Sequence, residues 1–239
     1  MHLLNRKYVT GALLLISVCV CHPAYGGYSR GGSFTAPGYG ARAWGMGGAA
    51  IATSGGEEAV LWNPAMLAYL DENRIGASYV NLVPGAKAHH SHLAYARVIQ
   101  RTRDDDIGRS LAAHAVGFIY SNLRIDVTDG SNYSENTFRF AYCYTPDYFI
   151  SFGAALNLLT SLSDYDNFGG FGTSVDAGMR LAITQSLTFA FVARNAASRI
   201  SFDDGSDFSL SRSYTAALAS DLLPRVNMEA DIVFAYGGV

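Results

Sequence analysis

Residues 40–70 read GARAWGMGGAAIATSGGEEAVLWNPAMLAYL, and this stretch decides how the rest of the chain is interpreted. It is rich in glycine, contains no lysine, and carries the turn Asn63-Pro64-Ala65 near its end. The glycines disfavour an ordinary helix, and the polar middle disfavours a strand that faces lipid. Proline suits a first helical position, which predicts a short helix starting near Pro64. We therefore expect a compact plug, around which the following residues wrap.

After Asp71 the sequence alternates between apolar and polar residues with a period of two, which is typical of β-strands. In the five clearest segments the charges fall on a single face, and the other face is purely apolar or aromatic. Such segregation indicates an outer-membrane barrel, with lipid outside and a polar lumen inside. A soluble β-sandwich would also alternate, but its exposed faces should carry many lysines, and Lys87 is the last lysine of the chain. The five segments are Thr137–Tyr144, Ile150–Leu158, Ser174–Leu181, Ser186–Arg194 and Val226–Phe234.

Weaker alternation predicts four more strands, near residues 73–82, 91–100, 110–120 and 212–220. The expected fold is all-β: an antiparallel transmembrane barrel with about nine or ten strands present, one of them short and inside the plug. Bacterial barrels of this kind have an even number of strands. Because the last segment lacks a terminal aromatic, either a smaller barrel closes with about ten strands or the sequence is cut short. We expect the second.

The charged side chains of the polar face are expected to point into the lumen. Either they line a pore or dock the plug, or they form a network of ion pairs across the wall that rigidifies the barrel. These residues are Arg139, Asp176, Arg180, Arg194, Glu229 and Asp231.

The composition excludes other classes of function. A net charge of −3 gives no electrostatic reason to expect a nucleic-acid partner. No Ser-His-Asp or Cys-His order with catalytic spacing is present, so we do not expect an enzyme. His89, His90 and His92 could bind a metal, but no acidic or cysteine partner lies nearby, and a polar strand end near the membrane rim is the favoured interpretation. No metal or other cofactor is expected.

The N-terminus has the features of a secretory signal peptide. Arg6 and Lys7 precede an apolar stretch from Ala12 to Cys21, and Ala24-Tyr25-Gly26 offers a small-x-small cleavage site. The apolar stretch is shorter than the roughly 20 residues of a membrane-spanning helix. We therefore expect a signal peptide over residues 1–26, a hatch over 27–72 and a barrel over 73–239, in a protein exported to the bacterial outer membrane.

Two blocks of the quoted stretch resemble the FadL/PorV superfamily of outer-membrane barrels, and the PorV/PorQ branch in particular. The first block is Arg42-Ala43-x-Gly45-Met46-Gly47-Gly48-Ala49, and the second is Glu58-Ala59-Val60-Leu61-Trp62-Asn63-Pro64-Ala65. The acidic residues usual between the blocks are replaced by Thr53–Glu58. The resemblance implies a barrel of about 14 strands, whose N-terminal segment forms a hatch in the lumen around the Asn-Pro-Ala turn. The hatch or gate residues would be Arg42, Gly45, Met46, Gly47, Gly48, Trp62, Asn63, Pro64 and Ala65.

The resemblance also implies two alternative functions. FadL-type members carry long-chain fatty acids or other hydrophobic compounds across the outer membrane, whereas PorV-type members receive exported proteins in type IX secretion. The expected partners are therefore outer-membrane lipid and either a hydrophobic ligand such as a fatty acid or a secretion-system protein, and we favour transport. The run Gly45–Gly48 lacks the strand and spacing of a phosphate-binding loop. We expect its glycines to let the plug backbone pack closely against the wall.

Overall fold

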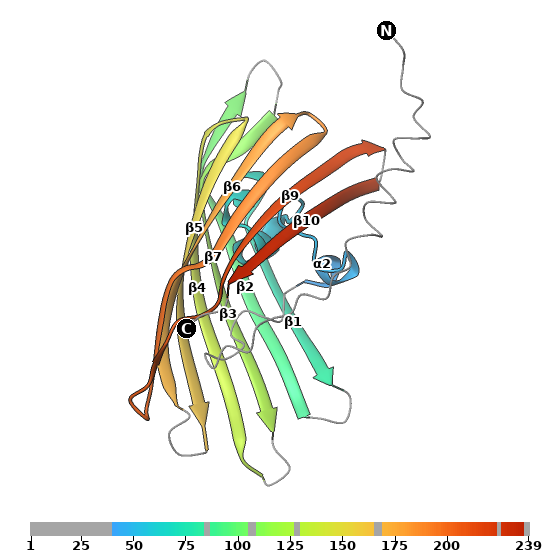
Figure 1. The fold of residues 1–239 in the computed structure, drawn as a ribbon. Coiled ribbons are helices and arrows are strands. Elements are labelled where there is room, and N and C mark those ends of the chain that lie inside the picture. Colours follow the sequence, from blue (N-terminus) through green and yellow to red (C-terminus); the bar gives the residue numbers. More distant parts are fainter. Residues whose placement is uncertain are drawn as a thin grey trace.

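The computed structural model describes residues 40–83, 87–104, 109–126, 130–164, 169–223 and 226–236. The predicted signal peptide, residues 1–26, lies outside these ranges, as does the remainder of the chain up to residue 39. The described residues form one long curved sheet and a short helical segment within its curve (Figure 1).

Nine long strands pair in the order β1-β2-β3-β4-β5-β6-β7-β9-β10, and the short strand β8 pairs with β7. All of the pairs are antiparallel, which confirms the predicted all-β class and each of the nine predicted strands. The strands are β1 (Arg74–Val83), β2 (Lys87–Asp104), β3 (Arg109–Asp126), β4 (Asn132–Asp147), β5 (Ile150–Ser163), β6 (Gly170–Thr184), β7 (Leu187–Phe202), β8 (Asp207–Phe208), β9 (Arg212–Leu223) and β10 (Val226–Tyr236).

Residues 40–70, hereafter the N-terminal segment, contain only short helices: α2 (Ala41–Gly45), η1 (Gly56–Glu58), α3 (Ala59–Trp62) and η2 (Pro64–Tyr69). The helix predicted to start near Pro64 is confirmed. The short strand expected inside the plug is wrong, because the described part of the plug is helical and the tenth strand is β8. In sequence order η2 follows the turn at Asn63, and it packs against β3, β4, β5 and β6.

Burial alternates along the strands because the N-terminal segment covers only one face of the sheet, here called the inner face. In β4 the inner residues Arg139 and Ala141 are buried, whereas Phe140 and Tyr142 on the outer face are 48% and 44% exposed. β5 and β6 repeat this pattern. The predicted separation of a charged face from an apolar face is therefore present in the fold, and the apolar face is the exposed one.

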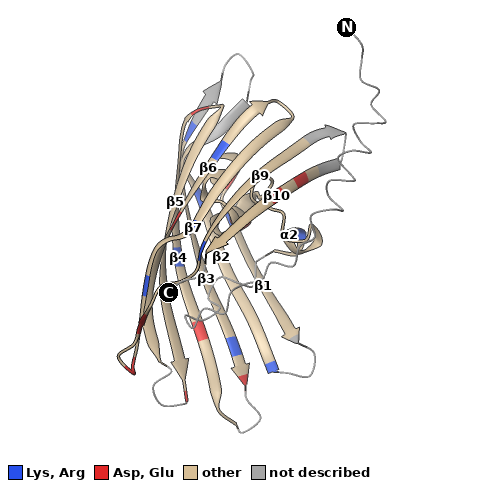
Figure 2. Ribbon diagram, viewed as in Figure 1, with Lys and Arg blue, Asp and Glu red and all other residues tan. Residues whose placement is uncertain are grey.

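The outer face of β3 and β4 changes character along its length. From the pair His114–Tyr144 to the pair Tyr120–Phe138 it is mainly aromatic and apolar. Beyond Tyr120 it becomes a polar rim, where the Tyr120 hydroxyl donates to Asn136 Oδ1 at 2.9 Å. Figure 2 shows the strands free of charge over most of their length. The polar rim consists of Asn122, Arg124, Asp126, Asn132, Ser134 and Asn136.

The polar rim lies at the end of the sheet where β3 connects to β4, here called the loop end. At the opposite end, the turn end, Tyr148–Phe149 joins β4 to β5 and Gln185–Ser186 joins β6 to β7. β1 and β10 form the two edges, and no pairing joins them among the residues that the structure describes. Within the same ranges, no helix has the length and apolarity needed to cross a membrane.

Candidate functional site

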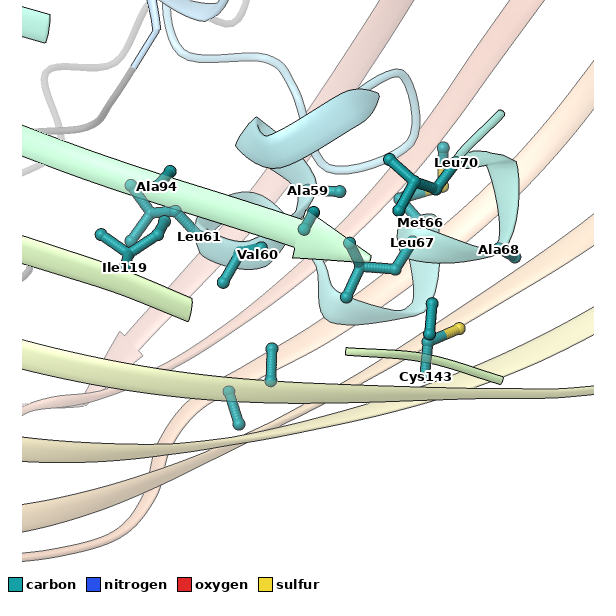
Figure 3. Close-up of a cluster of buried hydrophobic side chains, with 14 residues drawn as sticks. Ala59, Val60, Leu61, Met66, Leu67, Ala68, Leu70, Ala94, Ile119 and Cys143 are labelled. Atoms are coloured by element: carbon teal, nitrogen blue, oxygen red, sulfur yellow. The ribbon is translucent and has the colours of Figure 1, made fainter. Parts of the chain in front are cut away.

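The interface between the N-terminal segment and the inner face is the most completely buried part of the described chain. Val60, Leu67 and Ala68 of the segment have no exposed surface. They pack with Ile119 of β3 and Cys143 of β4 in one apolar cluster (Figure 3). Burying such side chains stabilises the docked segment by about 25 cal/mol for each Å² of apolar surface removed from water.

Glycines of the wall, rather than those of the segment, allow this close approach. A Cβ atom built on Gly153 of β5 would lie 2.3 Å from the Ala65 nitrogen, and one on Gly178 of β6 would lie 2.2 Å from Asn63 Oδ1. The expectation for Gly45–Gly48 is wrong, because a Cβ atom on Gly47 or Gly48 would meet nothing within 4 Å. Those two glycines have φ values of +69° and +86°, so they serve the left-handed turn that follows α2.

Asn63 fixes the Asn-Pro-Ala turn in place. Its Oδ1 accepts a hydrogen bond from the Ala65 backbone N–H at 3.0 Å, which caps η2. Its Nδ2 donates to the Ile51 carbonyl at 3.0 Å and to the Met179 carbonyl of β6 at 3.3 Å. Because Asn63 is fully buried, each of these partners replaces water that the amide has lost. One side chain therefore ties the turn both to its own segment and to the wall.

Arg139 and Asp176 form a buried ion pair between the sheet and α3, and each residue is 1% exposed. Arg139 Nε donates to the Val60 carbonyl at 2.6 Å, and Nη1 also donates to Asn157 Oδ1 at 3.1 Å. Asp176 Oδ1 accepts from the Asn195 backbone N–H at 2.7 Å. The last carbonyls of a helix have no partner within the helix, so a guanidinium is well suited to this position. The pair thus joins strands to one another and the wall to the segment.

Arg194 binds the adjacent carbonyl, because β7 contains a bulge at this point. The β6–β7 register shifts between Val175 and Ala177, and Asn195 has a φ of 51°, a value that asparagine tolerates better than most residues. Arg194 Nη2 donates to the Trp62 carbonyl at 3.1 Å, and its guanidinium lies 5.8 Å from the centre of the Trp62 ring. The roles of Asn157 and Asn195 were missed from the sequence, where an asparagine within a strand was the only signal.

The acidic residues of β10 contact the beginning of the segment. Glu229 Oε1 accepts from the Ala52 backbone N–H at 2.7 Å, and Oε2 accepts from the Thr53 hydroxyl. Asp231 lies on the same face of β10 and is partly buried. The last described strand, β10, is therefore attached to residues 52 and 53 of the N-terminal segment.

Arg42 stays close to the surface instead of entering the buried interface. Its Nη1 donates to the Thr53 carbonyl at 2.6 Å, which closes the part of the segment that follows α2. Burial raises the pKa of Glu58 nearby; Glu57 adds to this effect, and Arg42 opposes it. Met46 and the glycines around it form the turn between these contacts. Of the predicted hatch residues, those from Trp62 to Ala65 meet the sheet directly.

Arg180 is fully buried under Tyr69 of η2 and Tyr148 of the β4–β5 turn. Its Nη1 donates to the Tyr148 carbonyl at 3.0 Å, and its guanidinium lies 4.4 Å from the centre of the Tyr69 ring. Burial raises the pKa of the Tyr69 hydroxyl, and the charge of Arg180 partly offsets that effect. Arg180 thus stands apart from the Arg139–Asp176 pair.

The three histidines do not converge. His90 and His92 are buried on the inner face, and His92 Nε2 lies 3.1 Å from His90 Nδ1. The other ring nitrogen of His90, Nε2, contacts the Ser121 hydroxyl at 3.0 Å. His89 contacts Tyr79 on the outer face. In the described ranges no group of three or more His, Cys, Asp and Glu side chains could hold a metal ion.

Replacing a wall glycine should undock the segment. We expect Gly153→Ala or Gly178→Ala to cost on the order of 1–3 kcal/mol, because the added methyl group overlaps Ala65 or Asn63. Both tryptophans of the chain, Trp44 and Trp62, lie in the segment, so tryptophan emission reports its docking. The control Gly45→Ala meets nothing within 4 Å and should leave the emission unchanged. Equal behaviour of all three variants would contradict the close-packing account.

Removing one partner of the buried ion pair should destabilise the fold strongly. We expect Asp176→Asn to cost about 3–5 kcal/mol, because Arg139 would keep a buried charge without its partner. The matched control is Asp207→Asn, since the Arg199–Asp207 pair is largely exposed and should contribute little to stability. Urea-induced unfolding in detergent measures both values, and similar losses in the two variants would refute the assigned role.

No family model matches the chain, and neither does any curated protein or solved structure. What the interface can do follows from its chemistry: buried charges and close-packed glycines hold a short helical segment against the uncovered face of a curved sheet.

Proposed function

We propose that this protein is an outer-membrane β-barrel that carries hydrophobic small molecules, with the N-terminal segment as the hatch that controls entry. The observation that carries the proposal is the exposure of a broad uncharged face beside a buried polar one. Phe140, Leu156 and Val175 on the outer face are 48%, 45% and 40% exposed. In water this apolar area would be a liability, whereas in a bilayer it is the surface that contacts lipid.

The dimensions of the apolar band support this environment. On β4 the band runs from Phe138 to Tyr144 and continues into Phe149 at the turn end, close to the roughly 9–11 residues of a tilted membrane strand. The polar rim would then stand above the membrane. Arg97 is exposed beside Tyr95 on the outer face, and its long side chain can carry the charge to the interface.

Closure of the sheet is part of the proposal. In a bilayer an unpaired strand edge leaves backbone groups without hydrogen-bond partners, at a cost of several kcal/mol for each group. The edges at β1 and β10 would therefore be completed in a closed barrel, of about 14 strands if the resemblance of the N-terminal segment extends to the wall.

An apolar cluster on the inner face favours hydrophobic cargo over a protein partner. Leu159 and Ile200 are fully buried, and with Leu210 they form a cluster against which Phe202 packs. Leu159 lies on β5 between Gly153 at the hatch and the loop end, so this cluster would border the path of a solute from the loop end to the Asn-Pro-Ala turn.

An arginine in the apolar band should be costly only at membrane depth. We expect Leu156→Arg, at the middle of β5, to reduce the stability of the protein folded in lipid by about 2–4 kcal/mol. Leu162→Arg should reduce it by about 0–1 kcal/mol. Both leucines are exposed on the outer face of the same strand, and Leu162 pairs with Ser134 of the polar rim. Equal costs in lipid vesicles would rule out the proposed membrane position.

Cargo can be identified by purifying the protein from outer membranes and analysing bound lipids and proteins by mass spectrometry. We expect hydrophobic compounds to co-purify, and to decrease in Leu159→Ala because the apolar cluster beside the proposed path loses part of its packing. The control Leu162→Ala removes the same side chain from the outer face of the same strand. A stoichiometric exported or secretion-system protein, without enrichment of hydrophobic compounds, would contradict transport and support the partner function.

A further inference from the structure

A cavity of about 230 Å³ lies between the N-terminal segment and the turn end of the sheet. Its walls are mainly hydroxyl, amide and small apolar groups, and no acidic side chain lines it. The segment contributes Ala52, Thr53, Ser54, Gly55, Met66 and Tyr69, and the sheet contributes Tyr148, Ala182, Thr184, Gln185, Thr188 and Ala219.

A buried positive charge without a counter-charge lies directly behind this cavity. The Arg180 guanidinium packs against Tyr69 and Tyr148, two of the lining residues. Its Nε and Nη2 atoms have no hydrogen-bond partner, and the described residues supply it with no carboxylate within 4.0 Å. Arg139, by contrast, is paired with Asp176. A buried guanidinium without a carboxylate beside it makes this side of the cavity electropositive, which favours a bound anion.

A second unsatisfied group faces the same space. Ser54 is 1% exposed, its hydroxyl has no hydrogen-bond partner, and it lines the cavity. A buried hydroxyl without a partner costs about 1–3 kcal/mol. Ser54 belongs to the N-terminal segment and Thr188 to β7, so the cavity presents hydroxyl donors from both sides of the interface.

We propose that this cavity binds a small oxyanion, either a phosphate or a short carboxylate. The hydroxyls of Ser54 and Thr188 would contact the anion, and Arg180 would supply positive potential from behind the Tyr69 ring. The volume equals that of about seven or eight water molecules. It is below the roughly 300–1,000 Å³ of pockets for drug-sized ligands, so it suits a small ligand. The bound anion would join the segment to the sheet, whatever compound passes through the barrel.

Isothermal titration calorimetry on the folded protein in detergent tests this site with sodium phosphate and, separately, with sodium acetate. We expect saturable binding of at least one anion with one-to-one stoichiometry. Affinity should fall at least tenfold in Arg180→Gln and several-fold in Ser54→Ala, while Arg180→Lys should retain part of it. Sodium chloride at equal ionic strength should not bind. Arg199→Gln removes an exposed arginine elsewhere and should bind as the unchanged protein does.

The comparison of the two salts assigns the ligand: tighter phosphate binding indicates a phosphate group, and tighter acetate binding indicates a carboxylate. Absence of saturable binding of either anion would overturn the proposal, as would unchanged affinity in Arg180→Gln. If Arg180→Gln does not fold, the double variant Ser54→Ala, Thr188→Val decides the question, because it removes both hydroxyls and keeps the charge. Undiminished affinity in that variant would also overturn the proposal.

Discussion

The Arg139–Asp176 pair is buried between the sheet and the N-terminal segment, and the rest of the interface must supply hydrogen-bond partners for its two charges. Two buried charges are stable only when each is paired and further hydrogen-bonded. The sheet supplies Asn157 and the Asn195 backbone, and the segment supplies the Val60 carbonyl. Undocking the segment would therefore remove a partner of Arg139. The buried charge of the inner face is therefore stabilised by the segment, and the segment is held in place by that charge.

Close packing adds a geometric constraint to this electrostatic one. The wall approaches the Asn-Pro-Ala turn at Gly153 and Gly178, where any larger residue would overlap the backbone of Ala65 or the amide of Asn63. Asn63 then forms a hydrogen bond to the Met179 carbonyl of β6, and this bond exists only at that close distance. A segment held in this way has a defined docked position, and its undocking would be a discrete event because the ion pair, the amide and the apolar cluster share one segment.

The sequence predicted the strands and their faces well because the period of two is a local property of each strand. Phe140 and Arg139 are neighbours in the chain, and their opposite environments follow from that alone. The Asn-Pro-Ala turn was predictable for the same reason, since capping and proline placement are local. Partners distant in the chain were not predictable: the alternation shows that Arg139 and Asp176 share a face, but not that their side chains meet.

The remaining differences have the same origin. Glycines of the segment were expected to permit close approach, but the close contacts come from glycines on separate strands, which only the register brings beside the turn. The bulge at Asn195 alters the alternation of β7 midway, and a fixed period cannot anticipate it. Arg180 and Arg139 look alike in the sequence, although one has a carboxylate partner and the other packs on aromatic rings.

The central claim, that the outer face contacts lipid while the inner face holds the hatch, is tested most directly by spin labels in a bilayer. Cys143 is first replaced by alanine, and single cysteines are then placed at Phe140, at Asn122 in the polar rim and at Ser54 in the segment. The account predicts that the label at 140 collides with oxygen dissolved in lipid and not with a water-soluble nickel complex. The label at 122 should collide with the nickel complex and not with oxygen in lipid. The label at 54 should be shielded from both oxygen and the nickel complex. Equal access of the nickel complex to positions 140 and 122 would contradict the account.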